Sequence, residues 1–249
     1  MREAVMLAHG MWMGGWAMQG LRLLLSRRGY AACTFDYRSL AQGLDEHARL
    51  LAARVAQISQ PAVHLVGHSL GGLVILRYLR INGERHIGRI VLLGTPARAC
   101  MAGLRLENLA AGERLLGASR DIWRSLPEDY RPQRELGVIA GSRPWGLGAL
   151  LMRLPGTNDG VVRLEETEVA GMRDRIVLPV GHSGMLASAR VAREIAVFLE
   201  RGAFDHEGRG AFDHEGRSAF DHEGRGVFDR QGRGALNRDE HRAATRERP

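Results

Sequence analysis

Residues 1–201 alternate short apolar runs with stretches of helical periodicity. The apolar runs lack polar alternation, which is typical of strands buried on both faces of a sheet. Strands that alternate with helices imply right-handed crossovers and a mostly parallel sheet. We therefore expect an α/β fold with about six mostly parallel strands, at residues 4–8, 31–35, 63–66, 87–93, 137–140 and 175–180. Helices that cover both faces are expected at residues 16–28, 44–58, 71–81 and 185–199.

Residues 98–134 interrupt this alternation between the fourth and fifth expected strands. Their first part, residues 101–116, places leucines among charged residues in a loosely amphipathic pattern. Two interpretations are open: extra helices that pack on the domain, or a small helical cap over an apolar pocket. The second fits the rule that ligands bind at the carboxyl ends of the strands in an open α/β sheet, where such an insertion lies.

The composition changes sharply at Gly202, where an eight-residue repeat begins. The chain then reads GAFDHEGR, GAFDHEGR, SAFDHEGR and GVFDRQGR before the pattern decays. Such a unit is too short for a solenoid repeat, which needs about 20 residues or more, and its glycines disfavour ordering. We predict a domain at residues 1–201 and a disordered or irregular tail at residues 202–249. Alternatively, the recurrent Phe-Asp-His-Glu binds a partner or an ion.

Composition argues against several classes of protein. No apolar run approaches the ~20 residues that cross a bilayer, and the chain does not open with a secretory signal, so a cytoplasmic location is expected. Cys33 and Cys100 lack zinc spacing, which disfavours a disulfide framework and a structural metal. The net charge of +7 comes from 35 arginines and no lysine against 28 acidic residues. The arginines are scattered, so no nucleic-acid partner is expected.

The segment at residues 63–74 reads VHLVGHSLGGLV, an apolar run followed by Gly-x-Ser-x-Gly and a helical pattern. The five-residue motif is weak alone, but a strand-to-helix turn is the context that it requires. A sharp turn here forces Ser69 into strained backbone geometry, and Gly67 and Gly71 remove the Cβ atoms that would clash. The turn lifts the hydroxyl above the edge of the sheet, at the start of a helix. Ser69 is therefore the candidate nucleophile.

A serine hydroxyl needs a base, and the base needs a third group to orient it. His182 follows the last expected strand and therefore emerges at the same edge of the sheet as Ser69. His68 is adjacent to Ser69, but neighbours at a sharp turn point apart, so we expect it to be structural. His182 is the candidate base.

Asp159 is the candidate for the orienting acid, because it lies in a turn-rich loop, PGTNDG, after the fifth expected strand. The alternative is a simple Asp-Gly turn, with Glu165 or Glu166 as the acid. Asp174 precedes the last strand and is expected at the wrong end of the sheet. The order serine, aspartate, histidine along the chain differs from the orders of chymotrypsin and subtilisin.

Acyl transfer to a serine also needs hydrogen-bond donors for an oxyanion. The backbone amide of Leu70 follows from the turn geometry. The Met11 amide, in the loop after the first strand, is the expected second donor. Because both are backbone groups, replacing the Met11 side chain should leave oxyanion binding largely intact.

The motifs quoted above resemble those of the α/β-hydrolase superfamily, and more narrowly of small bacterial lipase/esterase-like members. They are HGMW at residues 9–12, GHSLGG at 67–72, LLGTP at 92–96, NDG at 158–160, and the late His182. The resemblance covers about residues 4–200 and excludes the repeats. It implies the minimal α/β-hydrolase fold with a small helical cap. Serine as nucleophile differs from the aspartate of haloalkane dehalogenases and epoxide hydrolases.

The resemblance implies a serine hydrolase that cleaves carboxylic esters of apolar acyl groups through an acyl-enzyme, with no metal or organic cofactor. The expected partner is a small-molecule or lipid ester, and a transient contact of the cap with a membrane surface is a further alternative. The residues expected to bind substrate are Trp12, Met13, Met101, Leu104 and Trp123. Thioesterase, lactonase, amidase or acyltransferase activity stays open, as does a non-catalytic binding or scaffold role of the repeats. The oligomeric state is also left open.

Overall fold

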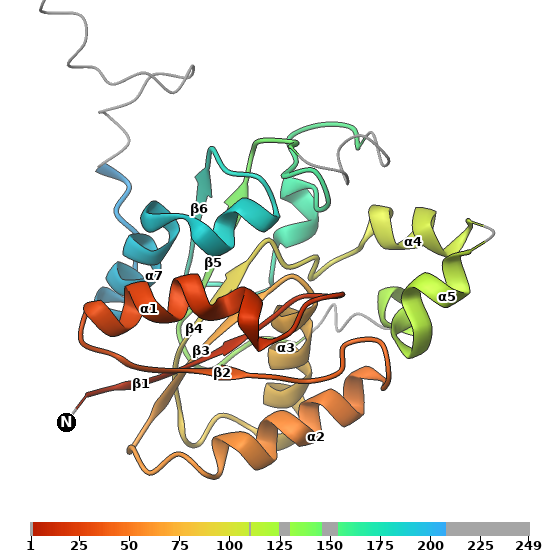
Figure 1. Ribbon diagram of the computed structural model, residues 1–249. Helices are drawn as coiled ribbons and strands as arrows, with labels where there is room; N and C mark the ends of the chain where they lie inside the picture. Colours follow the sequence, from red (N-terminus) through yellow and green to blue (C-terminus); the bar gives the residue numbers. More distant parts are fainter. Residues whose placement is uncertain (1, 110, 125–129, 146–153, 208–249) are drawn as a thin grey trace, which may run out of the picture. The chain divides into compact units, whose positions relative to one another are not determined.

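A computed structural model describes residues 2–109, 111–124, 130–145 and 154–207 of the chain. Six strands form one sheet in the order β2-β1-β3-β4-β5-β6, and every neighbouring pair is parallel (Figure 1). The strands are β1 (Ala4–Ala8), β2 (Ala31–Phe35), β3 (Val63–His68), β4 (Ile87–Leu93), β5 (Leu136–Gly141) and β6 (Asp174–Leu178). The expected α/β class is confirmed. The chain runs from β1 out to the edge strand β2 and returns past β1 to β3, which makes a switch point between β1 and β3.

Helices cover both faces of the sheet (Figure 1). Along β1, Val5 and Leu7 pack with one helical layer, whereas Ala4 and Met6 pack with the other. The first layer consists of the 3₁₀ helix η1 (Gly15–Met18), α1 (Gln19–Arg27), the 3₁₀ helix η4 (Ser183–Ala187) and α7 (Ala189–Arg201). The second layer consists of α2 (Leu44–Val55) and α3 (Leu70–Asn82). Because both faces are covered, the strands are apolar on both sides. None of the described helices is long and apolar enough to cross a bilayer.

Short helices fill the interval between β4 and β5. They are α4 (Met101–Glu107), α5 (Gly112–Leu116) and the 3₁₀ helix η2 (Gly117–Arg124). Leu106 and Leu116 are buried in the core of the α2–α3 layer, whereas Leu104, Leu109 and Leu115 are exposed. The interval therefore packs on the domain and also carries apolar side chains at the surface.

The first compact unit of the chain runs to His206, beyond the domain boundary expected at residue 201. Helix α7 ends at Arg201, and Gly202 caps it in the left-handed conformation. Phe204 is then buried in the core between the sheet and the α1–α7 layer. The first residues of the repeat thus belong to the folded domain. The prediction for residues 208–249 lies outside the described residues.

Candidate active site

Ser69 stands at the turn between β3 and α3 with φ 54° and ψ −121°. Residues with a Cβ rarely adopt a positive φ, so this backbone is strained. The Ser69 amide donates to the carbonyl of Leu93 in β4 at 2.9 Å. A Cβ on Gly71 would lie 2.4 Å from the carbonyl oxygen of Ala8, so the turn packs directly against β1. These contacts fix Ser69 at the carboxyl end of β3.

His182 and Asp159 form a buried pair, with 2.7 Å between His182 Nδ1 and Asp159 Oδ2. The His182 amide also donates to the Asp159 carbonyl at 2.9 Å. The other carboxylate oxygen, Oδ1, accepts from the amides of Val161 at 2.9 Å and Val162 at 2.7 Å. Burial alone would raise the pKa of Asp159, but His182 and these donors outweigh it and hold the pKa below its usual range. The carboxylate is therefore ionised and aligned on the ring.

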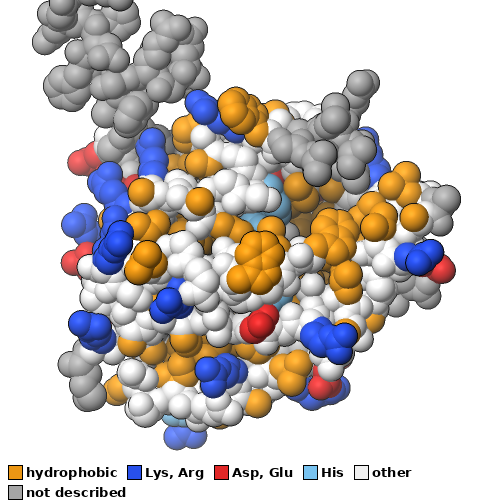
Figure 2. Space-filling view, in the orientation of Figure 1, with side chains coloured by type: hydrophobic (Ala, Val, Ile, Leu, Met, Phe, Trp, Pro, Cys, Tyr) orange, Lys and Arg blue, Asp and Glu red, His pale blue; other side chains and the backbone are white. Residues whose placement is uncertain are grey.

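Gly94 marks where this pair meets the sheet. A Cβ on Gly94 would lie 2.8 Å from Asp159 Oδ2 and 3.1 Å from His182 Nδ1. Gly94 follows Leu93, whose carbonyl binds the Ser69 amide. The structure thus brings Ser69, Asp159 and His182 together at the carboxyl ends of β3 and β4. Figure 2 shows histidine atoms at the floor of a hollow with hydrophobic side chains on its rim.

No hydrogen bond joins Ser69 Oγ to the His182 ring among the residues that the structure describes. Hydrogen bonds between a nucleophile and its base are often long without substrate and tighten in the substrate complex.

The two expected oxyanion donors lie beside Ser69. Leu70 is the first residue of α3, so its amide has no partner within the helix. Met11 follows Gly10, and a Cβ on Gly10 would lie 3.2 Å from the Ser69 Cβ. The loop after β1 and the start of α3 therefore flank the serine.

Residues 5–158 match the family described as alpha/beta hydrolases. The chain belongs to the alpha/beta hydrolase family. No curated protein matches this hydrolase.

Solved structures of similar fold include several hydrolases. The mature form of the lipase BlEst2 from Bacillus licheniformis has a TM-score of 0.66 at 19% identity, covering 81% of this chain and 92% of that one. A pyrethroid hydrolase from Sphingobium faniae has a TM-score of 0.60 at 16% identity, covering 81% of this chain and 98% of that one. A thermophilic esterase from Thermogutta terrifontis has a TM-score of 0.60 at 16% identity, covering 80% of this chain and 90% of that one. At these identities the likeness concerns the fold.

His9 supports the loop of this hydrolase that carries Met11, a contact that sequence reasoning missed. His9 Nδ1 lies 2.9 Å from the Gly10 carbonyl oxygen. The Tyr37 amide faces His9 Nε2 at 3.3 Å, and the Tyr37 hydroxyl donates to the His9 carbonyl at 2.8 Å. The two rings stack with centroids 4.3 Å apart. The sequence signal was the place of this histidine directly before the glycine of the loop.

His68 contacts His182 as well as preceding Ser69. Its Nε2 lies 3.1 Å from the His182 carbonyl oxygen, and the two rings are 4.6 Å apart. Burial, aided by the nearby His182, lowers the pKa of His68 to about 3. The ring is therefore neutral at ordinary pH, and its Nε2–H donates to the carbonyl. His68 holds the main chain of His182 in place, which extends the structural role expected for it.

The residues expected to bind substrate differ in exposure. Met13 and Met101 are half-buried, and Leu104 is exposed. Trp12 is 56% exposed, and its indole N–H donates to the carbonyl of Leu115 in α5 at 2.8 Å. Trp12 thus links the loop after β1 to the helices between β4 and β5. The side chain of Trp123 lies outside the described residues, and contact of any of these residues with a substrate stays a prediction.

The alternative acids have other partners. Glu166 Oε1 accepts from the Met101 amide at 2.8 Å, and Oε2 accepts from the Arg163 amide at 2.8 Å. Burial raises the pKa of Glu166. Glu165 forms an ion pair with Arg163. Glu166 therefore ties the start of α4 to the loop that carries Asp159.

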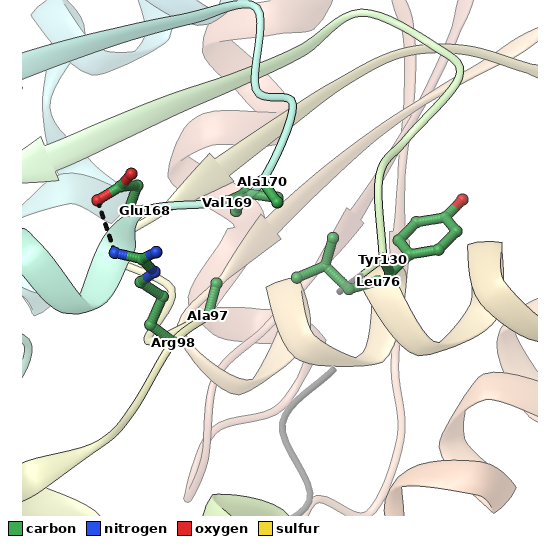
Figure 3. A pocket seen from close by; sticks show the side chains of 7 residues that line it. All are labelled: Leu76, Ala97, Arg98, Tyr130, Glu168, Val169 and Ala170. Carbon is green, nitrogen blue, oxygen red and sulfur yellow. Dashed lines mark hydrogen bonds and ion pairs between the residues drawn. The ribbon is translucent and has the colours of Figure 1, made fainter. Parts of the chain in front are cut away.

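Two cavities of the described part lie away from Ser69. One encloses about 10 Å³, room for about one water, and lies between α3 and the loop before β6; its lining includes the ion pair of Arg98 and Glu168 (Figure 3). The other is an open groove of about 300 Å³ over the loop that begins at Pro155. Neither is lined by Ser69, Asp159 or His182, although Glu165, an alternative acid, lines the second. Within the same described part, no three His, Cys, Asp or Glu side chains are grouped as metal ligands.

Proposed function

We propose that this alpha/beta hydrolase is a serine hydrolase that cleaves carboxylic esters of apolar acyl groups. The observation that carries the proposal is the meeting of Ser69 with the buried His182–Asp159 pair at one edge of the sheet. The lipase and esterase among the structures of similar fold support the reaction class.

In the proposed reaction, His182 Nε2 takes the proton of Ser69 as Oγ attacks the ester carbonyl. Asp159, bound to Nδ1, keeps the ring in place and stabilises the imidazolium. The amides of Met11 and Leu70 donate to the oxyanion, and each such donor contributes about 2.7–4 kcal/mol. The alcohol leaves with the proton from His182. A water activated by the same ring then releases the acid from Ser69.

The proposed substrate is apolar because the residues around the serine are apolar. Met11 and Leu70 are buried beside it, and Met13 and Met101 are half-buried. Exposed leucines on the short helices, including Leu104, extend this character to the surface. A comparison of monomeric and micellar esters measures the contribution of that surface, since a lipid-docking cap raises turnover only above the micelle concentration.

A fluorophosphonate probe tests the nucleophile. We expect it to label Ser69 alone, and Ser69→Ala to abolish both labelling and hydrolysis of p-nitrophenyl esters without changing the circular dichroism spectrum. Ser183→Ala, adjacent to His182, is the matched control and should keep both. Labelling at Ser183, or full turnover by Ser69→Ala, would overturn the assignment. A panel of acyl chain lengths then measures the size of the pocket.

A further inference from the structure

Two neighbouring loops lie at the carboxyl edge of the sheet. The β1 loop, residues 9–14, follows β1 and leads into η1, and the β2 loop, residues 36–39, follows β2. Because β1 and β2 are paired and parallel, both loops leave the sheet at the same edge. The β1 loop carries Met11, the proposed oxyanion donor. The contacts between the two loops therefore decide where that donor lies.

The β2 loop holds both ends of the β1 loop. At the start, Tyr37 binds the carbonyl and the ring of His9. At the end, the amide of Gly15, the first residue of η1, donates to Asp36 Oδ1 at 2.9 Å. The β1 loop is thus fixed at its two ends by one short segment of chain.

Between these ends, Trp12 adopts a strained backbone conformation. Its φ is 58°, a region that residues with a Cβ rarely enter. Such a conformation persists only where the surrounding structure holds it. Ser39 Oγ accepts from the Trp12 amide at 3.2 Å, and Ser39 is 5% exposed. The Ser39 hydroxyl therefore fixes the peptide between Met11 and Trp12.

Ser39 is itself held by the segment that follows α5. The hydroxyl of the buried Ser119 donates to the Ser39 carbonyl. The Ala118 amide donates to the Leu40 carbonyl at 3.0 Å. A Cβ on Gly117 would lie 2.5 Å from the same Leu40 oxygen, so the two segments are in direct contact. The acceptor of the Trp12 amide is therefore itself fixed in place.

The Met11 amide lies between this contact and the nucleophile. On the side of the nucleophile, a Cβ on Gly10 would lie 3.2 Å from the Ser69 Cβ. On the other side, the Trp12 amide is occupied by Ser39. No residue that the structure describes accepts from the Met11 amide. Of these two successive amides, only that of Met11 is free to bind an oxyanion.

We propose that Ser39 is a positioning residue for ester hydrolysis, whose hydroxyl holds the Trp12 amide and thereby orients the Met11 amide toward the oxyanion. The inference rests on the proposed function and adds to it a residue outside the reacting groups. Without the hydroxyl, Trp12 would relax from its strained φ, and the Met11 peptide would turn with it. The oxyanion exists only in the tetrahedral state, so the loss acts on that state and spares the bound ester.

Ser39→Ala tests the proposal. We expect kcat for a p-nitrophenyl ester to fall by about 10- to 100-fold, below the roughly 10²- to 10³-fold cost of removing an oxyanion donor, while KM stays within about twofold. The affinity for a trifluoromethyl ketone, which forms a tetrahedral oxyanion adduct with a serine, should fall by the same factor as kcat/KM. Ser39→Thr keeps the hydroxyl and should restore most of both.

Ser188→Ala is the matched control, because the Ser188 hydroxyl also accepts from one backbone amide, that of Val191, at 3.3 Å. Both variants lose one such hydrogen bond, so urea titration should show similar losses of stability. Only Ser39→Ala should lose kcat and affinity for the ketone. If Ser39→Ala does not fold, Ser39→Cys provides the same comparison, because a thiol is a weaker acceptor than a hydroxyl.

The outcomes separate this inference from the proposed function. If the unchanged chain hydrolyses esters, full kcat in Ser39→Ala, or an equal loss of kcat in Ser188→Ala, would overturn the positioning role alone. A rise in KM at unchanged kcat would overturn it as well, because Ser39 would then act on the bound ester. An unchanged chain that neither hydrolyses esters nor binds the ketone would overturn the proposed function, and the role of Ser39 with it.

Discussion

At the scale of single residues, Asp159 connects the folding of a loop to the proposed chemistry. One of its oxygens holds the amides of Val161 and Val162, and the other faces His182. The same carboxylate therefore shapes its loop and aligns the ring. Its proposed role in catalysis can be separated from its role in folding because an asparagine side chain keeps the shape and removes the charge.

We expect Asp159→Asn to lower kcat by about 10⁴-fold, because the ring loses the acceptor that selects its tautomer. KM should change little, since the residue does not line the acyl site. Steady-state hydrolysis of a p-nitrophenyl ester measures both. Glu165→Gln, a change of an exposed acid six residues further along the chain, is the control and should keep near-normal kcat. Equal losses in the two variants would contradict the assignment of the acid.

His68 carries a prediction about pH. Its pKa in the folded protein is about 3, below the ordinary value of 6.5. As the pH falls, the unfolded chain therefore binds a proton first, and stability is lost between about pH 6.5 and pH 3. Between pH 6.5 and about pH 4.5, the free energy of unfolding should fall by about 2 kcal/mol because of this histidine.

In His68→Gln, which keeps a side-chain donor, we expect this part of the pH dependence to disappear. Urea unfolding at the two pH values measures the free energy of unfolding, and His86→Gln, a change at an exposed histidine, should behave like the unchanged chain. Parallel pH curves for His68→Gln and the unchanged chain would show that burial of this ring does not control acid stability.

At the scale of elements, hydrophobic periodicity located the strands but not every end. The predicted and observed bounds agree for β1, β2 and β4, while β3 continues to His68. The last helix was expected at residues 185–199, whereas η4 precedes α7, which starts at Ala189 because the Ser188 hydroxyl caps it through the Val191 amide. Helix ends depend on such hydrogen bonds, which periodicity does not register.

The candidate site was predictable to the extent that its signals are local. The strand-to-helix turn predicted Ser69, and the chain order of the strands placed His182 and Asp159 at the same edge. The contacts of His68 with His182 join residues 114 positions apart, and the link of Trp12 to Leu115 spans 103. No local pattern contains such pairings, so they required the fold.

The Trp12 link leads to a prediction at this scale. Trp12 has φ 58°, its amide donates to Ser39 Oγ at 3.2 Å, and its indole binds the Leu115 carbonyl. Trp12→Phe keeps the ring but removes the indole donor, worth about 1 kcal/mol. We expect KM to rise by about fivefold, the same energy expressed as affinity, with kcat nearly unchanged.

Kinetics with a long-chain p-nitrophenyl ester measure the effect of Trp12→Phe. The matched control is Trp16→Phe, because the Trp16 indole is 74% exposed and has no hydrogen bond within the described part of the chain. The same change in KM for both variants would contradict the proposed coupling between the loop and α5.

At the scale of the whole molecule, the first residues of the repeat are packed into the folded domain. Phe204 joins the core between the sheet and the α1–α7 layer, and Asp174 at the first position of β6 fixes the chain there. Phe204 and Asp174 therefore lie toward the amino ends of the strands, whereas Ser69 and His182 lie at the carboxyl ends. Loss of the Phe204 contacts should therefore lower the free energy of unfolding without changing the rate of ester hydrolysis.

Two truncations test this separation. A chain that ends at Gly202 loses Phe204, and we expect its free energy of unfolding to be about 3 kcal/mol lower than that of a chain ending at Glu207. Both chains should hydrolyse p-nitrophenyl esters at similar rates at a temperature where both are folded. Denaturant titration measures the free energy of unfolding of the two chains, and an ester assay measures their rates of hydrolysis. Equal stability would mean that the buried ring contributes nothing, and a dead shorter chain would place the repeat in the catalytic machinery.

The place where the folded domain ends also decides how the molecule can be attached to a support. His206 lies beside Asp174, the first residue of β6. A bead, an electrode or a fused cargo on a chain that ends at Glu207 is therefore joined at the amino ends of the strands. Attachment there would leave the carboxyl ends of β3 and β4, where Ser69 lies, unobstructed, whereas attachment at exposed residues of α4 or α5 would crowd the loop that carries Trp12.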